Sequence, residues 1–369
     1  MNKKIITVFL ISGIALTLGA CTDNRGQNSS SSYVSSAESS SGSASEAKKV
    51  IGFSLAGPNG APSYALGGVY KENKDHITVG APQSTVMPAL ATGSAGMLIF
   101  DSANMARRMK GKATNYYNYV GLITGGNVYV VATGHDANKT IDENDRIVSF
   151  GSKSIFTSVF KAAYGYKGAI AEVADTATAA TVAATGLNGG EAVDYVLVAE
   201  PVLTMQIAQN KIKKENVLAS LSDKWLEYTK EKGYNGGKGY SFYPQAGLFI
   251  SKTLEKDTSK KGEITSFIKS VWSACADFAE NNGQQTLATI EADLNDGVYG
   301  DSKDTAFGTN IKAVKKCANE STNGFKKKNA MGFIDKYIDI NAFLKETAED
   351  LGFPAYEEEN ISSYSTIER

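Results

Sequence analysis

The chain is poor in the residues that most often hold metals or exchange protons in active sites. Its 369 residues include two histidines, three cysteines and two tryptophans. His76 and His135 lie in polar, loop-like stretches, and neither has cysteines or carboxylates nearby at the spacing of a metal site. We therefore expect two surface histidines, with no metal and no cofactor.

Paired catalytic groups are missing as well. The stretches 158–161 and 266–269 both match Ser-x-x-Lys, but the sequence lacks the Ser-Asp-Asn and Lys-Thr-Gly triplets that accompany this motif in penicillin-interacting enzymes. The acidic run 357–359 lies near the C-terminus, where a solvated tail is expected instead of two carboxylates converging on one bond. The sequence predicts a protein that is not an enzyme.

No charge of one sign dominates the chain. It has 38 basic and 39 acidic residues and a net charge of −1, and its densest basic group is the short run 326–328. A nucleic-acid-binding surface needs lysines and arginines clustered on one face. We therefore expect no nucleic-acid partner.

The longest apolar run lies at the N-terminus. Lys3 and Lys4 precede the apolar residues 5–16, and small residues lead to Cys21, which is the pattern of a secretory signal peptide over residues 1–20. Residues 18–21, Leu-Gly-Ala-Cys, resemble the bacterial lipobox, in which the cysteine becomes the lipid-modified first residue of the mature chain. An ordinary cleaved signal with a chance cysteine is the alternative.

Residues 21–48 are rich in serine and hold almost no apolar side chains. Such a segment cannot offset the entropy cost of ordering, so we expect a disordered tether between the lipid and a folded domain. The sequence thus predicts a protein that is anchored to the cell membrane through lipid at Cys21 and faces outside the cytoplasm.

Two cysteines remain after lipidation of the first. Cys275 and Cys317 both lie in the C-terminal, helical part of the chain. An exported pair of this kind can form a disulfide where the geometry permits. Two separate buried thiols are the alternative.

The chain from Val50 onward alternates short apolar runs with helical patterns. The apolar runs lie at 50–56, 77–80, 95–100, 119–123, 127–133, 146–150, 192–200 and 243–252. This alternation favours an α/β fold of strand–helix units with mainly parallel sheets. After Lys261 the pattern is helical nearly to the C-terminus, with apolar residues at helical spacing at Ile264, Phe267, Ile268 and Val271.

The stretch 146–160 joins one of these apolar runs to a helix. One face of the helix is apolar, with side chains in the i, i+3, i+4, i+7 pattern at Phe156, Val159, Phe160 and Ala163. Gly151 allows a close backbone approach, and Ser152 or Ser154 can cap the helix. Its first amides lack partners within the helix and attract an acceptor group. A ligand at this helix end and an ordinary hydroxyl cap both fit the stretch.

Three other strand ends have the same character, with turns of glycine, asparagine, aspartate, serine or threonine within 56–66, 100–108 and 122–130. In open α/β sheets, ligands bind at the carboxyl ends of the strands. In this order, and followed by Ala-Glu-Pro-Val-Leu-Thr at 199–204 and Tyr-Pro-Gln-Ala-Gly at 243–247, the turns resemble the solute-binding proteins of ABC importers. The likeness is to members that bind nitrate, sulfonates, taurine and thiamin-pyrimidine precursors.

This resemblance implies a two-lobed type II periplasmic-binding-protein clamshell, with mixed sheets flanked by helices and a helical C-terminus. Residues 49–145 and 246–369 would form lobe 1, and residues 146–245 would form lobe 2. A ligand would lie between the lobes. By position in the family, the ligand would contact Asn59, Gly60, Ala61, Ser102, Ala103, Asn104, Thr124 and Gly125 from lobe 1, and Ser152, Lys153, Ser154, Glu200 and Tyr243 from lobe 2.

The resemblance further implies a monomer that captures a small polar or heteroaromatic nutrient, such as a sulfonate, an anion or a pyrimidine or vitamin precursor. It would deliver this solute to an ABC permease and its ATPase. Arg107 and Arg108 fall past the binding loop, whereas tyrosines that could stack on a flat ring lie at 64, 116, 117 and 243. The alternative is a lipoprotein adhesin or sensor that keeps the fold and contacts a partner protein.

Overall fold

The computed structural model describes residues 50–112, 115–134, 140–299, 307, 311–319 and 328–369. The described residues belong to one compact unit. The predicted signal peptide, the lipidation site Cys21 and the tether lie outside the described residues. In the part of the chain that is described, no helix combines the length and the apolar character needed to cross a membrane.

The described strands form two five-stranded sheets and a short ribbon of β8 (Leu187–Asn188) and β9 (Glu191–Ala192). The first sheet has the order β2-β1-β3-β12-β4. Its strands are β1 (Leu55–Pro58), β2 (Ile77–Gly80), β3 (Met97–Asp101), β4 (Tyr117–Leu122) and β12 (Ala246–Ser251). β1 pairs in parallel with β2 and β3, whereas β12 runs antiparallel to β3 and β4.

The second sheet has the order β11-β5-β10-β6-β7. Its strands are β5 (Val128–Ala132), β6 (Ile147–Phe150), β7 (Ile170–Val173), β10 (Tyr195–Ala199) and β11 (Val217–Ser220). β6 pairs in parallel with β7 and β10, whereas β5 runs antiparallel to β10 and β11. In order and strand direction the second sheet therefore repeats the first.

The reversed strand of each sheet connects the two sheets directly. β5 follows β4 of the first sheet along the chain, and β12 follows the last described strand of the second sheet. The predicted lobe boundary at residue 145 places β5 in lobe 1, but β5 pairs with β10 and β11 of the second sheet. Two adjacent apolar runs look alike in sequence whether or not they share a sheet, so hydrophobic pattern alone does not assign β5 to its sheet.

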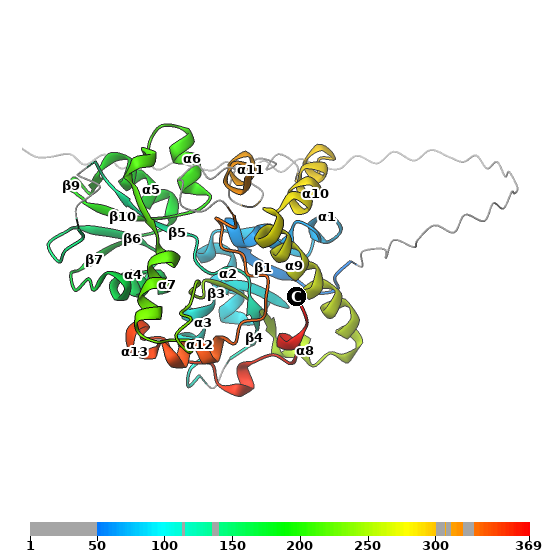
Figure 1. Ribbon diagram of the computed structural model, residues 1–369. Coiled ribbons are helices and arrows are strands. Elements are labelled where there is room, and N and C mark those ends of the chain that lie inside the picture. The colour runs from blue at the N-terminus through cyan, green and yellow to red at the C-terminus, as the bar shows by residue number, and fades with distance from the viewer. Residues whose placement is uncertain (1–49, 113–114, 135–139, 300–306, 308–310, 320–327) are drawn as a thin grey trace, which may run out of the picture. The chain divides into compact units, whose positions relative to one another are not determined.

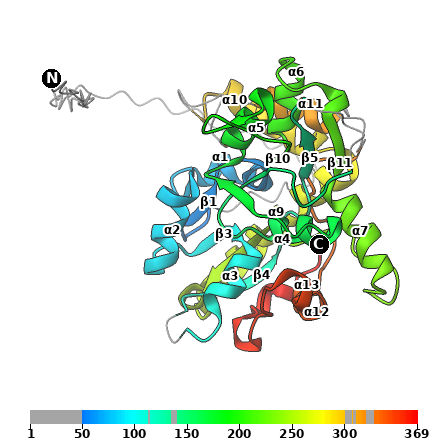
Figure 2. The same ribbon diagram turned by 90° about the vertical axis from the view of Figure 1, so that its left-hand side faces the viewer.

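Helices cover the sheets (Figure 1; Figure 2). With the first sheet lie α1 (Tyr70–Asn73), α2 (Pro82–Thr92), α3 (Ser102–Met109) and α8 (Lys252–Glu255); with the second lie α4 (Ile155–Tyr164), α5 (Thr176–Thr185), α6 (Val202–Ala208) and α7 (Leu221–Glu231). The helical C-terminal part contains α9 (Lys261–Asn281), α10 (Gln284–Asn295), α11 (Ile311–Asn319), α12 (Ile340–Glu346) and α13 (Ala348–Leu351).

Apolar spacing in the sequence explains which helix faces are buried. On α9, Ile264, Phe267, Ile268 and Val271 are all buried in a cluster with strands of the first sheet. Another cluster contains Leu122 of the first sheet together with Val130 and Leu197 of the second. Strands of both sheets therefore contribute side chains to one apolar cluster.

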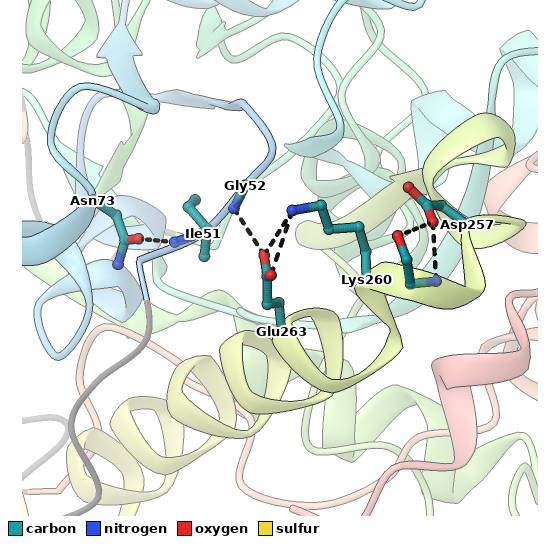
Figure 3. Close-up of polar contacts among 7 residues, drawn as sticks. Ile51, Gly52, Asn73, Asp257, Lys260 and Glu263 are labelled. Atoms are coloured by element: carbon teal, nitrogen blue, oxygen red, sulfur yellow. Dashed lines mark hydrogen bonds and ion pairs between the residues drawn. The ribbon is translucent and has the colours of Figure 1, made fainter.

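The start of the compact unit is tied down by buried and part-buried polar groups (Figure 3). The Ile51 amide donates to the side-chain oxygen of Asn73, and the Asn73 side-chain nitrogen donates to the Val69 carbonyl at 2.6 Å. The Gly52 amide donates to a Glu263 carboxylate oxygen at 3.0 Å, and Lys260 lies 3.3 Å from the same oxygen. These contacts hold the first described residues against α9 and α1.

Replacing Asn73 by alanine is expected to destabilise the fold. Asn73 is 2% exposed, so the change leaves the Ile51 amide and the Val69 carbonyl without their side-chain partner in a buried site. The expected loss is about 1–3 kcal/mol of unfolding free energy, measured by urea denaturation. Asn144→Ala, at an exposed position, is the matched control. Equal stability of the two variants would show that the Asn73 contacts do not hold this terminus.

Candidate functional site

In each sheet, all strands but the reversed one have their carboxyl ends at the junction where the chain passes between the sheets. β4 leads through residues 123–127 into the start of β5, and β12 begins just after residues 242–245. β3 and β4 run against β12, so their ends lie beside its start, where Asp101 pairs with Ala246. β6, β7 and β10 run against β5, so their ends lie beside the start of β5, where Ala199 pairs with Val128. Such an edge is where open α/β sheets bind ligands.

The first predicted loop follows β1. Asn59 is exposed, and its amide donates to the Gly80 carbonyl at 2.8 Å. The Gly60 amide donates to the Phe307 carbonyl, and Gly60 has φ 107°, a conformation that favours glycine. Ala61 is 3% exposed and begins a short 3-10 helix that ends at Leu66. Asn59 is therefore the member of this loop whose side chain is open to solvent.

The second predicted loop begins α3. Asp101 caps the helix, because its carboxylate accepts the Asn104 amide at 2.8 Å and the Asn104 side-chain nitrogen at 2.9 Å. Ser102 and Ala103 are fully buried, and Asn104 is part-exposed. The Ser102 amide and hydroxyl both donate to the Gln245 carbonyl, at 2.7 and 2.8 Å. Ser102 thus binds the segment that leads into β12.

Thr124 and Gly125 lie in the segment that leads from β4 to β5. The Thr124 amide donates to the Ala246 carbonyl at 3.1 Å, and its hydroxyl accepts the Ala246 amide at 3.2 Å. The Gly125 amide donates to the Gly332 carbonyl at 2.7 Å. The two segments that pass between the sheets, residues 123–127 and 242–246, therefore lie side by side and are hydrogen-bonded to each other.

Gln245 joins these segments, and the sequence analysis missed it. Its side-chain oxygen accepts the amides of Gly126 and Asn127, at 2.7 and 3.2 Å. Both amides are buried and lie just before β5, where the chain leaves one sheet for the other. The available signal was an amide side chain directly before the apolar residues 246–250, because a covered amide needs a hydrogen-bond partner.

The third predicted loop precedes α4. Ser152 and Lys153 are exposed, and Lys153 has φ 54° with its amide donating to Glu172 at 3.0 Å. Ser154 occupies the N-cap position, but its hydroxyl pairs with the Thr157 hydroxyl at 2.9 Å and makes no capping bond to an amide. Of the two serines considered as caps, Ser154 therefore takes the N-cap position, but its hydroxyl is bonded to Thr157 instead of to an amide of the helix.

Glu200 and Tyr243 are buried at the junction. The two Glu200 carboxylate oxygens accept the Thr204 amide and hydroxyl, each at 2.9 Å. The Glu200 carbonyl also accepts the Asn127 side-chain nitrogen at 3.0 Å. Tyr243 is 0% exposed, and burial raises the pKa of its hydroxyl. Of the tyrosines considered for stacking, Tyr64, Tyr117 and Tyr243 are packed inside, and Tyr116 is exposed.

The cysteines are separate buried thiols. Cys275 and Cys317 are both free. Burial raises the pKa of Cys275 to about 12 and also raises the pKa of Cys317, which lies near Glu200. The disulfide considered from sequence does not form. Among the described residues, no cluster of three or more histidine, cysteine or acidic side chains is arranged to hold a metal ion.

A cavity of about 400 Å³ lies away from this junction, between α4, α7 and β11. Tyr164 and Tyr228 line it, together with Ile141 and Leu218 and the charged Lys224 and Glu227. Lys224 and Glu227 are paired with each other at 2.7 Å. None of the residues predicted to bind the solute lines this cavity.

Gln245→Leu is expected to destabilise the junction. Leucine fills the same volume but leaves the buried amides of Gly126 and Asn127 without an acceptor, which costs about 1–3 kcal/mol. Gln245→Glu keeps an acceptor for both amides and should lose less. Urea unfolding of the three proteins measures the difference. A Gln245→Glu variant as unstable as Gln245→Leu would contradict the role given to this oxygen.

Asp101 is expected to give the fold a pH dependence between about 4 and 6. Burial raises the pKa of Asp101 from 3.8 to about 6, although the hydrogen bonds from Asn104 act to lower it. The folded chain then binds this proton more tightly than the unfolded chain, so the Asp101 contribution to stability increases as the pH falls through this range. Asp101→Asn should remove that increase in urea unfolding measured at several pH values. Asp175→Asn, at the exposed N-cap of α5, controls for the change of cap residue. An unchanged profile in Asp101→Asn would contradict the assignment.

No family model matches the chain, and no curated protein matches it. Solved structures do. The ligand-binding component of an ABC-type import system from Staphylococcus aureus, with zinc bound, has a TM-score of 0.55 at 11% identity, over 86% of this chain and 99% of that chain. A protein from Bordetella bronchiseptica has a TM-score of 0.53 at 14% identity, over 86% and 96%. An ABC transporter structure from Parabacteroides distasonis has a TM-score of 0.52 at 13% identity, over 85% and 99%.

Identities this low show the likeness of the fold. The two sheets of this chain carry the same strand order, each with one reversed strand among those described, and helices flank both. The predicted fold class is therefore confirmed as an α/β fold with two mixed sheets flanked by helices and a helical C-terminal part, and this fold is like that of the ligand-binding component of an ABC-type import system.

Proposed function

We propose that this protein is an extracytoplasmic solute-binding lipoprotein of an ABC importer. The observation that supports this most is that the two sheets have the same strand order, each with one reversed strand, β12 or β5. Each reversed strand begins where the other strands of its sheet end, so these strand ends lie at one junction. Loops from two separate sheets can then contact a single small molecule. A solute that touches both sets of loops favours the arrangement in which they are close.

The predicted residues divide by exposure into two proposed roles. Asn59 and Asn104 from the first sheet, and Ser152 and Lys153 from the second, keep side chains at least partly open to solvent and are proposed to contact the solute. The buried members are proposed to hold the junction; they are Ala61, Ser102, Ala103, Thr124, Gly125, Ser154, Glu200 and Tyr243. Gly60 supplies the tight turn that presents Asn59.

The proposed solute is small and polar or heteroaromatic: a sulfonate, an anion, or a pyrimidine or vitamin precursor. Lys153 and the N-terminal amides of α4 favour an acceptor or anionic group beside Ser152. The Staphylococcus aureus structure contains zinc. The described residues of this chain contain no group of three or more histidine, cysteine or acidic side chains that could hold a metal ion. Zinc is therefore not the proposed solute.

The proposed setting follows from the N-terminal sequence. Lipidation at Cys21 would hold the protein at the outer side of the cell membrane, and the serine-rich residues 21–48 would let the folded unit reach a permease. The permease and its ATPase are the proposed partners, and the protein is proposed to act as a monomer. The solute-binding assignment concerns capture and delivery, with no chemical step on the solute.

A true solute is expected to raise the melting temperature of the protein. A ligand at one hundred times its dissociation constant adds about 2.7 kcal/mol to the folded state. Thermal unfolding with sulfonates, inorganic anions, pyrimidines and vitamin precursors identifies the class. Once a solute is found, Asn59→Ala and Ser152→Ala should each weaken its binding about fivefold, as for one lost hydrogen bond.

Calorimetric titration of each variant measures this loss, and Ser241→Ala, at an exposed position on the loop before β12, is the control that should bind as the parent does. Unchanged affinity in both Asn59→Ala and Ser152→Ala would place the solute elsewhere. Absence of stabilisation by every class of solute would instead favour the adhesin.

A further inference from the structure

The last part of the chain begins and ends on the first sheet. We call residues 333–369 the C-terminal strap. At its start, Phe333 forms a bridge with Thr124, and the Ile334 amide donates to the Ile123 carbonyl at 2.9 Å. At its end, the Arg369 guanidinium donates to the Leu122 and Ile334 carbonyls, at 2.7 and 2.8 Å. Both ends of the strap are therefore fixed to the region of β4.

The middle of the strap lies against the second sheet's helices. α12 and α13 leave the first sheet and lie beside α7, as both views show (Figure 1; Figure 2). Phe343 of α12 is 1% exposed, and its ring centroid lies 4.8 Å from Tyr240, 5.3 Å from Phe242 and 6.4 Å from Trp225 of α7. The resemblance to type II binding proteins places all of 246–369 in lobe 1, but α13 packs against α4 of the second sheet, and Phe343 of α12 contacts α7 and the segment that follows it.

Hydrogen bonds to two carboxylates fix the position of this middle part. The hydroxyls of Tyr228 and Tyr234 donate to the two Asp350 oxygens, at 2.7 and 2.6 Å. The Tyr240 hydroxyl donates to Glu346 at 2.5 Å, and the Asn235 amide donates to the same carboxylate at 3.0 Å. Burial, followed by the bond to Asp350, raises the pKa of Tyr234 to about 12, so its hydroxyl remains a donor.

The returning limb of the strap is held by the first sheet's site loop. The Tyr356 hydroxyl donates to the Ser102 carbonyl at the start of α3. Arg107 of α3 lies 4.1 Å from the centre of the Phe353 ring. Asn341 of α12 exchanges two hydrogen bonds with the Tyr356 backbone, at 2.8 and 2.9 Å. The strap thus connects α7 of the second sheet with the Asp101–Asn104 loop of the first.

A site that opens, as the proposed function requires, must release this connection. Buried bonds such as that of Tyr356, which is 4% exposed, would leave unpaired groups if broken. Glu346 is exposed and Asp350 part-exposed, so water can replace their tyrosine partners. The apolar contacts of Phe343 are non-directional and tolerate a small shift. α13 also packs against α4, and this contact is apolar as well. Among the attachments of the strap's middle part, the tyrosine–carboxylate bonds are the directional ones whose partners water can replace.

We propose that the C-terminal strap is a latch, in which the bonds of Asp350 and Glu346 to the α7 side hold the two sheets' site loops close and are released when the site opens. This inference rests on the proposed function, because only a capture protein needs its site loops to separate. Removal of the bonds to Asp350 and Glu346 should raise the population of molecules in which the site loops of the two sheets are apart. No residue proposed to contact the solute is changed.

The test measures a distance in the full chain without solute. Spin labels attached through an introduced keto side chain at positions 74 and 167, both exposed, report the separation of the two sheets without using the native cysteines. Tyr234→Phe combined with Tyr240→Phe removes two bonds to carboxylates while the rings stay in place. The ratio of long to short distances is expected to rise about tenfold or more. Tyr337→Phe, at a tyrosine 60% exposed in the same strap, is the control and should leave the ratio unchanged.

A distance distribution like that of the parent, in a double variant that melts cooperatively, would overturn the latch. Tyr234→Phe alone keeps the Tyr228 bond to Asp350, so its ratio of long to short distances should lie between those of the parent and the double variant. This single variant carries the test if the double variant does not fold. Since no solute is present, a failure to find any solute would refute the proposed function and leave this measurement intact. A solute that binds while the variant's distances stay unchanged would refute the latch alone.

Discussion

Two segments that pass from sheet to sheet must pair every buried backbone group on the way, and this requirement shapes the rest of the structure. Inside a sheet the neighbouring strand supplies the partners, but residues 123–127 and 242–246 have left one sheet and only begin to enter the other. Their backbone groups find partners in the neighbouring segment, as at Thr124 and Ala246. The Gln245 side chain accepts hydrogen bonds from two further amides. Because these bonds are short-range and directional, they fix where β5 and β12 start.

The starting points of β5 and β12 in turn decide where a ligand can be held. Each is the reversed strand of its sheet, so the other strands end where it begins. The polar residues at those ends therefore have two uses. Ser102, Thr124 and Glu200 are buried and already bonded within the junction, whereas Asn59, Ser152 and Lys153 remain open. The site and its support are built from the same loops.

The sequence predicted local elements well because local pattern determines them. The run 77–80 is β2, and the apolar stripe of α9 is buried as its spacing indicated. The α4 stripe is likewise buried at Phe156, Val159 and Phe160. What the sequence pattern left open depends on contacts between distant residues: the sheet to which β5 belongs, and whether Cys275 and Cys317 form a disulfide or remain free thiols.

The same limit applies to the candidate site and the strap. A turn rich in serine and asparagine looks the same whether its side chains bind a solute or a neighbouring segment, and Gln245 gave no pattern of its own. Nothing in the spacing of Tyr228, Tyr234 and Tyr240 indicates carboxylate partners more than a hundred residues later, at Glu346 and Asp350. These pairings become visible only when the two sheets and the C-terminal strap are placed in space.

The central claim is that one small molecule is held between the strand ends of the two sheets. A crystal structure of the protein grown with a solute that stabilises it tests this most directly. The account predicts the solute in contact with the loop at Asn59 and with the loop at Ser152 and Lys153 together. A solute bound by the loops of one sheet alone, or in the cavity between α4 and α7, would contradict it.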